Sequence, residues 1–183
     1  GEAGLPEVEF REGPLGSGLV VIGDLADVSV VTDSSVEGRV SQILQPMRVS
    51  EALDLLAAEH GVLWWVEDSV VRVSRVRVVR NAAGAGDGGA AGSLAVRAVE
   101  APLAAVAARA AAAGGRPLLF DRLPDDPVTL RLPGVGVEEL ARVLVRRHPR
   151  FAVEASEEAV YIRDTSRRDA DARARAFDVT RDA

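Results

Sequence analysis

The sequence contains no cysteine and no lysine. Without cysteine the chain has no disulfide, no thiol nucleophile and no Cys-based zinc site. A phosphate-binding loop needs a lysine after its glycines, so the glycine-rich stretch 84–92 is interpreted as a linker and not as a nucleotide site. These two absences remove several large classes of enzyme.

Aromatic residues are scarce at 4%, and hydrophobic residues make up 48%, so aliphatic side chains must fill the core. No apolar run reaches the ~18–20 residues of a membrane-spanning helix, and we expect no membrane span in this stretch. The net charge of −6 argues against a nucleic-acid partner, because such binders need a basic surface. The sequence begins with Gly1, and we expect it to be a piece of a longer protein.

Residues 81–93 read NAAGAGDGGAAGS, a composition typical of a flexible linker. The halves on either side match each other at a spacing of 87–88 residues, as in the pairs Asp33 with Asp121 and Trp64 with Phe151. A common offset across a whole half indicates a tandem duplication. The predicted organisation is a first module at 1–80, a Gly/Ala linker at 81–93, a second module at 94–166 and a polar connector at 167–183.

Each half predicts the order β-α-β-β-α-β-β, with mixed or antiparallel sheets and two helices, and hence an α+β fold. Pro14 should open the first helix and Ser50 should cap the second, which should end at Gly61. The alternation of Val with Arg or Ser over 70–79 predicts one long strand. Leucines and isoleucine at positions 15, 19, 22 and 25 fall on one helical face, although Gly16, Gly18 and Gly23 weaken this helix.

The helix motif VSEALDLL at 49–56, Gly61 and the aromatic-containing hairpin at 64–73 resemble the secretin and TonB short N-terminal domain. The second half is similar through Pro102-Leu103, PVTL at 127–130, VEEL at 137–140 and the hairpin 151–162. The three glycines of the first helix depart from the family, which usually has better helix formers there. The second helix of the second half lacks the full motif.

This resemblance implies a periplasmic module. In secretins such modules form stacked rings below an outer-membrane channel, whereas in TonB-dependent receptors a single copy signals to an inner-membrane regulator. Tandem copies favour the secretin-like arrangement. We therefore expect a non-catalytic interaction and assembly module of a bacterial envelope complex, with protein partners that include neighbouring copies. A periplasmic small-ligand or glycan-binding domain and a receptor signalling domain are the alternatives.

Histidine is present only as His60 and His148, one near the end of the second helix of each half. One histidine per module does not make a zinc site, and a position close to the negative helix C-terminus explains both. Asp125 and Asp126 fit a turn between strands better than a cation site. We therefore predict no enzyme activity, no metal and no cofactor.

Four arginines at 142, 146, 147 and 150 cluster at the end of the last helix. They fit an acidic partner, including the first module of a neighbouring copy, since residues 1–80 hold 13 acids against seven arginines. The other interpretation is a solvated helix end that complements the helix dipole.

Side chains alternate across a strand, so Trp64 should be in the core while Leu63 and Trp65 lie on an outer, exposed face. The other interpretation is that this face is buried against the linker or the other module. The hairpin edges at 70–79, which include Val76 and Val78, and at 159–163 should receive a partner strand or a neighbouring subunit. The candidate partner-binding residues are Leu63, Trp65, Val76, Val78, Arg142, Arg146, Arg147 and Arg150. Alternation at Phe177 and Val179 predicts the first strand of a further module.

Overall fold

The computed structural model describes residues 3–82 and 92–167. Its chain forms two compact units, a first module of Gly1–Arg77 with Ala98–Ala101 and a second module of Val78–Arg97 with Pro102–Ala183. Most of the predicted linker, and the predicted strand at Phe177 and Val179, lie outside the described residues. The predicted domain boundaries stay predictions.

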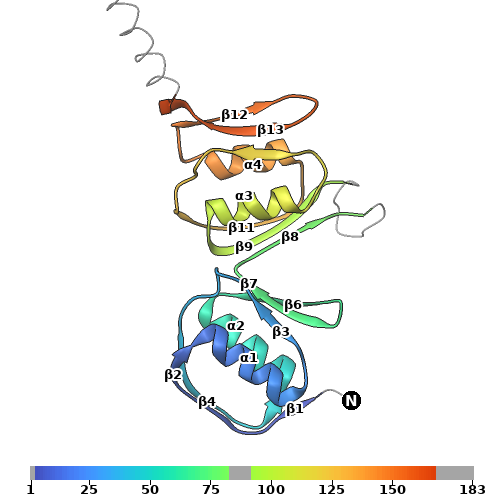
Figure 1. The fold of residues 1–183 in the computed structure, drawn as a ribbon, viewed down its shortest axis with the longest axis vertical. Coiled ribbons are helices and arrows are strands. Elements are labelled where there is room, and N and C mark those ends of the chain that lie inside the picture. The colour runs from blue at the N-terminus through green and yellow to red at the C-terminus, as the bar shows by residue number, and fades with distance from the viewer. Residues whose placement is uncertain (1–2, 83–91, 168–183) are drawn as a thin grey trace, which may run out of the picture. The chain divides into compact units, whose positions relative to one another are not determined.

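The first module places two helices between two sheets (Figure 1). One sheet has the order β2-β4 and the other β3-β7-β6, in which β3 and β7 are parallel and β6 and β7 are antiparallel; a short pair β1-β5 accompanies them. The elements are β1 (Gly4–Leu5), β2 (Val8–Pro14), α1 (Leu15–Ala26), β3 (Val30–Thr32), β4 (Arg39–Leu44), β5 (Met47–Arg48), α2 (Val49–His60), β6 (Leu63–Glu67) and β7 (Val70–Ser74).

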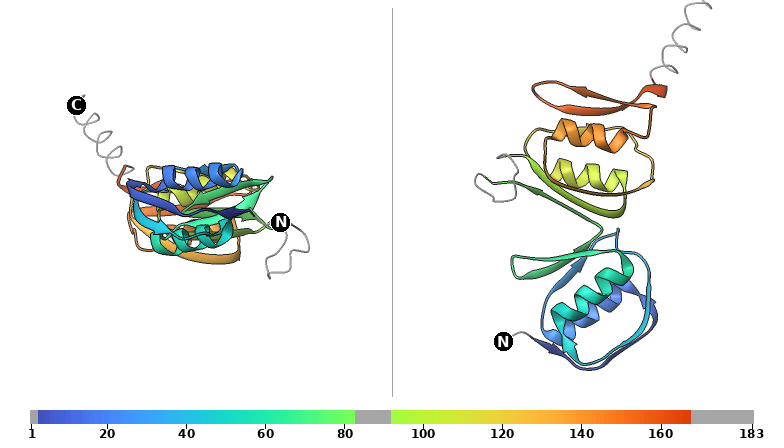
Figure 2. Two further views of the ribbon diagram at one scale, coloured as in Figure 1. Left: turned by 90° about the horizontal axis from the view of Figure 1, so that it is seen from below. Right: turned by 180° about the vertical axis from the view of Figure 1, so that it is seen from behind.

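The second module repeats this layering, with its two helices between the sheets β11-β9-β8 and β10-β13-β12 (Figure 2). Again the third strand of the module pairs in parallel with its last strand, and the final hairpin is antiparallel. The elements are β8 (Val76–Arg80), β9 (Leu94–Pro102), α3 (Leu103–Ala112), β10 (Leu118–Phe120), β11 (Pro127–Val135), α4 (Val137–Val145), β12 (Phe151–Ala155) and β13 (Val160–Asp164). The predicted α+β class is confirmed. The short strands β1 and β5 and the strand β8 are additions to the predicted order, and the tandem duplication stays a prediction.

Both modules enter their first helix in the same way. Glu12 in β2 and Glu100 in β9 have left-handed backbone angles, with φ of 48° and 43°. Two residues later Pro14 and Pro102 precede α1 and α3, with φ of −59° and −56°. In β2 the pairing register shifts between Phe10 and Gly13, so the strand bends there and turns the chain into the helix. Pro14 opens the helix as predicted.

The second helix of the first module differs from the prediction at its start and agrees at its end. Helix α2 begins at Val49, so Ser50 lies inside it and does not cap it. Instead the carboxylate of Glu51 accepts a hydrogen bond from the backbone N–H of Arg48, at 3.0 Å. Gly61 ends the helix with φ of 62°, a conformation that glycine adopts without strain.

The glycines of α1 have a packing reason that the helix pattern did not reveal. Gly18 and Gly23 are both buried. A Cβ added at Gly18 would lie 3.1 Å from Val40 Cγ1, and one at Gly23 would lie 2.5 Å from the carbonyl oxygen of Val28. Strands therefore approach this helix too closely for larger residues. Leu25 was grouped by helical spacing with positions 15, 19 and 22, but it is 48% exposed whereas those three are buried.

The predicted strand 70–79 is two strands, broken at Arg75. Strand β7 ends at Ser74, and β8 begins at Val76 and lies beside β9 in the other sheet. The side chain of Arg75 donates to the carbonyl oxygens of Ser35, at 2.9 Å, and Gly61, at 3.1 Å. These bonds fix the bend, which sequence alternation alone could not predict.

Candidate protein-binding surfaces

The four clustered arginines divide into two pairs with different surroundings. Arg142 donates to Glu138 at 2.8 Å, one helical turn away, and so lowers the pKa of that carboxyl. Arg150 forms an ion pair with Asp164 at 3.1 Å and lies over the ring of Phe151. Within the ranges that the structure describes, Arg146 and Arg147 have no ion pair. These last two are the cations left available to a partner.

Arg146 and Arg147 line a groove of about 570 Å³ in the second module. One wall is the start of β11 and the other is the C-terminal part of α4. The remaining lining residues are mostly aliphatic, and they are Leu103, Asp126, Pro127, Val128, Thr129, Leu130, Val143, Leu144 and His148. β11 pairs with β9 along one edge, and no strand of the described residues pairs with its other edge. The groove thus combines apolar surface, positive charge and an open strand edge.

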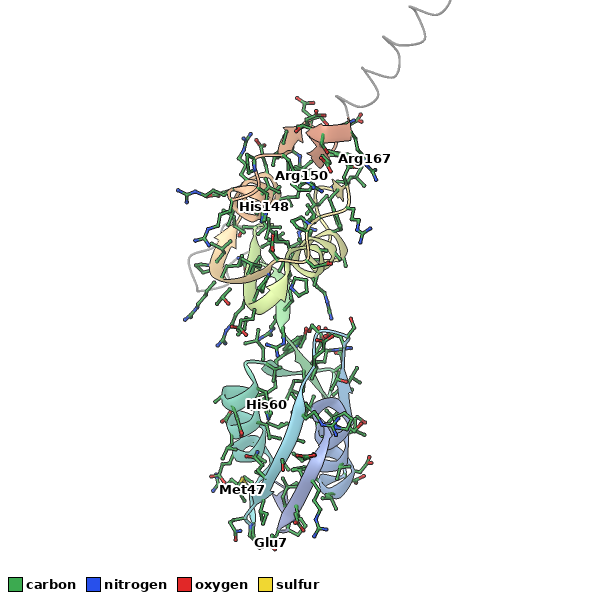
Figure 3. The ribbon with its side chains drawn as sticks, turned by 90° about the vertical axis from the view of Figure 1, so that its left-hand side faces the viewer. Glu7, Met47, His60, His148, Arg150 and Arg167 are labelled. Carbon is green, nitrogen blue, oxygen red and sulfur yellow. The ribbon has the colours of Figure 1, made fainter. Side chains whose placement is uncertain are left out.

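His148 lies at the same groove and faces Asp126, with 3.6 Å between Nε2 and the nearer carboxylate oxygen. Figure 3 labels it near Arg150, and His60 in the other module. His60 is the last residue of α2, in agreement with the prediction that it lies near the end of this helix. Among the described residues no group of three or more histidines and acids is placed to hold a metal ion.

The face expected to carry an exposed Leu63 and Trp65 is only partly open. Leu63 is 7% exposed, so the prediction that it is exposed is wrong. It lies opposite Ser74 at the end of the sheet, where the Arg75 side chain folds back to the Gly61 carbonyl. Trp65 is half-buried, with the guanidinium of Arg77 over its ring at 5.1 Å. Its role in partner binding stays a prediction.

Trp64 points to the opposite face and packs against the core of the first module, as expected. It is half-buried rather than fully buried, because its indole N–H reaches out to the carboxylate of Asp54 at 2.8 Å. The tryptophan thus joins β6 to α2.

The strand around Val76 and Val78 is not a free hairpin edge of the first module. It is β8, the outermost strand of the sheet β11-β9-β8. Val76 is 1% exposed and Val78 is half-buried. One edge of this strand is therefore occupied by β9, and partner binding at the remaining edge stays a prediction.

Asp33 and Asp121 match each other in the comparison of the two halves, which gave them no role. Each of them bonds to the last strand of its module. Asp33 accepts from the hydroxyl of Ser74, at 2.5 Å, and from the backbone N–H of Ser35, at 2.9 Å. Asp121 accepts from the hydroxyl of Tyr161, at 3.0 Å, and from the backbone N–H of Asp164, at 2.7 Å. In both modules the aspartate after the third strand bonds to the last strand.

These bonds shift two acid constants of the second module. The backbone N–H of Asp164 lowers the pKa of Asp121, because a hydrogen-bond donor stabilises the carboxylate. The same carboxylate raises the pKa of the Tyr161 hydroxyl, since ionised tyrosine could no longer donate to it. The common offset of Asp33 and Asp121 was the signal for this feature.

Helix α1 exposes an apolar surface that the sequence pattern also missed. Its exposed members are Val20, Val21 and Leu25. The helix is apolar on more than one face, so periodicity did not separate the buried side from the open one.

Among the described residues, none of the helices has the length and apolar composition of a membrane-spanning helix.

Comparisons with known proteins give likenesses among solved structures. No family model matches the chain, and no curated protein matches it. Among solved structures the chain is similar to the N0 domain of the type II secretin from enterotoxigenic Escherichia coli, at 20% identity and a TM-score of 0.34. That similarity covers 38% of this chain and 93% of the secretin domain.

Proposed function

We propose that this chain is a non-catalytic interaction and assembly module of a bacterial envelope complex, located in the periplasm. The observation that carries the proposal is the groove beside α4. In the described part of the chain, two arginines without an ion pair lie there next to aliphatic side chains and a strand edge with no partner. An extended segment of a partner protein suits such a surface, because its backbone can pair with the edge while its side chains enter the groove. The motif at 49–56 and the hairpin at 64–73 resemble the secretin and TonB short N-terminal domain, and this resemblance supports a location in the cell envelope.

The charges define the partner further. Arg146 and Arg147 are exposed, and the one acid in the groove lining, Asp126, faces His148. A partner segment that carries acidic side chains between aliphatic ones would neutralise the arginines and cover the aliphatic wall. Removing both arginines should lower the affinity for such a partner. The affinity that remains should also depend less on salt concentration than that of the natural chain, because salt screens charge pairs.

The test is capture of envelope proteins by the whole chain and by two variants. The double substitution Arg146→Ala and Arg147→Ala should abolish capture of a specific protein, whereas Arg142→Ala should not. Arg142 is a matched control because it lies on the same helix but is paired with Glu138 and is not part of the groove. The captured protein is then purified and titrated against all three chains. Equal affinity for the three would refute the proposed surface.

A further inference from the structure

The two modules differ in the sheet that contains the strand before their first helix, which is β2 in the first module and β9 in the second. In the second module β9 lies between β11 and β8. In the first module the corresponding strand β2 pairs with β4 alone, in the described residues. The edge that β8 occupies in one module is therefore open in the other, although both first strands share the left-handed glutamate and the proline that follows.

Strand β2 has the length and composition of a strand that accepts a selected partner. It runs for seven residues, and Val8 and Phe10 face the core while Glu9 and Arg11 are exposed. An unpaired strand edge presents a row of free backbone N–H and C=O groups. Charged residues on it discourage uncontrolled pairing. Glu9 is bonded to Arg11 of the same strand, at 2.9 Å and 3.1 Å, and Glu12, together with Glu7 just before the strand, leaves the exposed charge acidic overall.

The same chain carries an edge strand of opposite charge. Strand β8 is the last strand of its sheet, and Arg77 and Arg80 are exposed on it. Val76 is buried while Arg77 and Val79 are exposed, so β8 alternates in the same manner as β2. Strand β8 already pairs with β9, which is the counterpart of β2 in the second module.

We propose that the open edge of β2 in one copy of the chain pairs with the open edge of β8 in a second copy, joining two sheets into one. In the joined sheet Glu9 of one copy lies on the same face as Arg77 and Val79 of the other. The two surfaces are different, so the contact is head-to-tail and repeats from copy to copy into a ring or a filament. This inference rests on the proposed function, since it names one partner of the assembly module.

Disulfide cross-linking tests the contact directly, because the chain has no cysteine of its own. A Glu9→Cys chain is mixed with a Val79→Cys chain of different tag length, and the mixture is oxidised and run on a non-reducing gel. The same mixture with Arg77→Cys is run in parallel, so that two positions of one face are sampled. The control replaces Glu9→Cys by Glu59→Cys, an exposed position on α2. A mixed dimer well above the control is expected, and a yield equal to the control at both positions would overturn the proposal.

A charge exchange gives an independent measurement. Sedimentation of the natural chain should show association that rises with concentration, and Glu9→Arg or Arg77→Glu alone should weaken it about three- to tenfold, as expected for loss of one exposed charge pair. Mixing the two reversed chains should restore association, which a simple folding defect would not do. A natural chain that stays monomeric at millimolar concentration contradicts the inference. Capture through Arg146 and Arg147 would be untouched by that result, so failure of this contact and failure of the proposed function are distinguishable.

Discussion

Two glycine-to-alanine substitutions in helix α1 should have opposite effects on the stability of the first module. Both replace glycine by a better helix former, which by itself stabilises a helix by up to about 1 kcal/mol. At Gly16 the new Cβ would meet only Thr32 Oγ1, at 3.5 Å, an ordinary contact. Gly16→Ala should therefore be neutral or stabilising.

At Gly23 the new Cβ would lie 2.5 Å from the Val28 carbonyl oxygen and 2.5 Å from Val30 Cγ2. The backbone cannot easily move away, because the N–H of Val28 donates to the carbonyl of Gly23 at 2.9 Å. Overpacking of this kind costs about 1–3 kcal/mol, which exceeds the gain in helix propensity. Gly23→Ala should therefore be less stable than Gly16→Ala by about 1–3 kcal/mol.

Urea unfolding followed by tryptophan fluorescence measures this difference in the whole chain. The chain has two tryptophans, Trp64 and Trp65, and both lie on β6, so the signal reports the first module. With a typical dependence of about 1–3 kcal/mol per molar urea, the two midpoints should differ by roughly 1 M. Identical midpoints for Gly16→Ala and Gly23→Ala would show that β3 does not approach α1 as closely as described.

Three further predictions use the polar contacts of the two modules. Asp54→Ala removes the acceptor of the Trp64 indole N–H and should lower the free energy of unfolding of the first module by up to about 1 kcal/mol, read from urea midpoints. Asp121→Asn should lower the pKa of the Tyr161 hydroxyl toward its ordinary value, because the carboxylate that raises it is gone; ultraviolet titration of the single tyrosine measures this, and an unchanged pKa would disprove the contact. Ser74 is buried, and Ser74→Ala removes the hydroxyl that bonds to Asp33 and to the backbone N–H of Val76; it should lower the free energy of unfolding of the first module by about 1–3 kcal/mol, and an unaltered tryptophan unfolding curve would contradict this.

The sequence by itself determined the class of fold and the positions of most elements. Helix α1 follows Pro14 and helix α2 ends at Gly61, both as predicted. These succeed because apolar alternation and the backbone restriction of proline act within a few residues of the chain. The repeated order was visible for the same reason, since each half carries its own local pattern.

The candidate surfaces depended on tertiary structure. Four clustered arginines look alike in the sequence, yet Arg142 and Arg150 are paired and Arg146 and Arg147 line the groove. Leu63 was assigned to an exposed face by alternation and is buried; it lies opposite Ser74, just before the chain bends at Arg75. That bend is held by hydrogen bonds to groups far away along the chain. Periodicity tells which face of an element is apolar, but the partner of a polar side chain is chosen by what folding brings beside it.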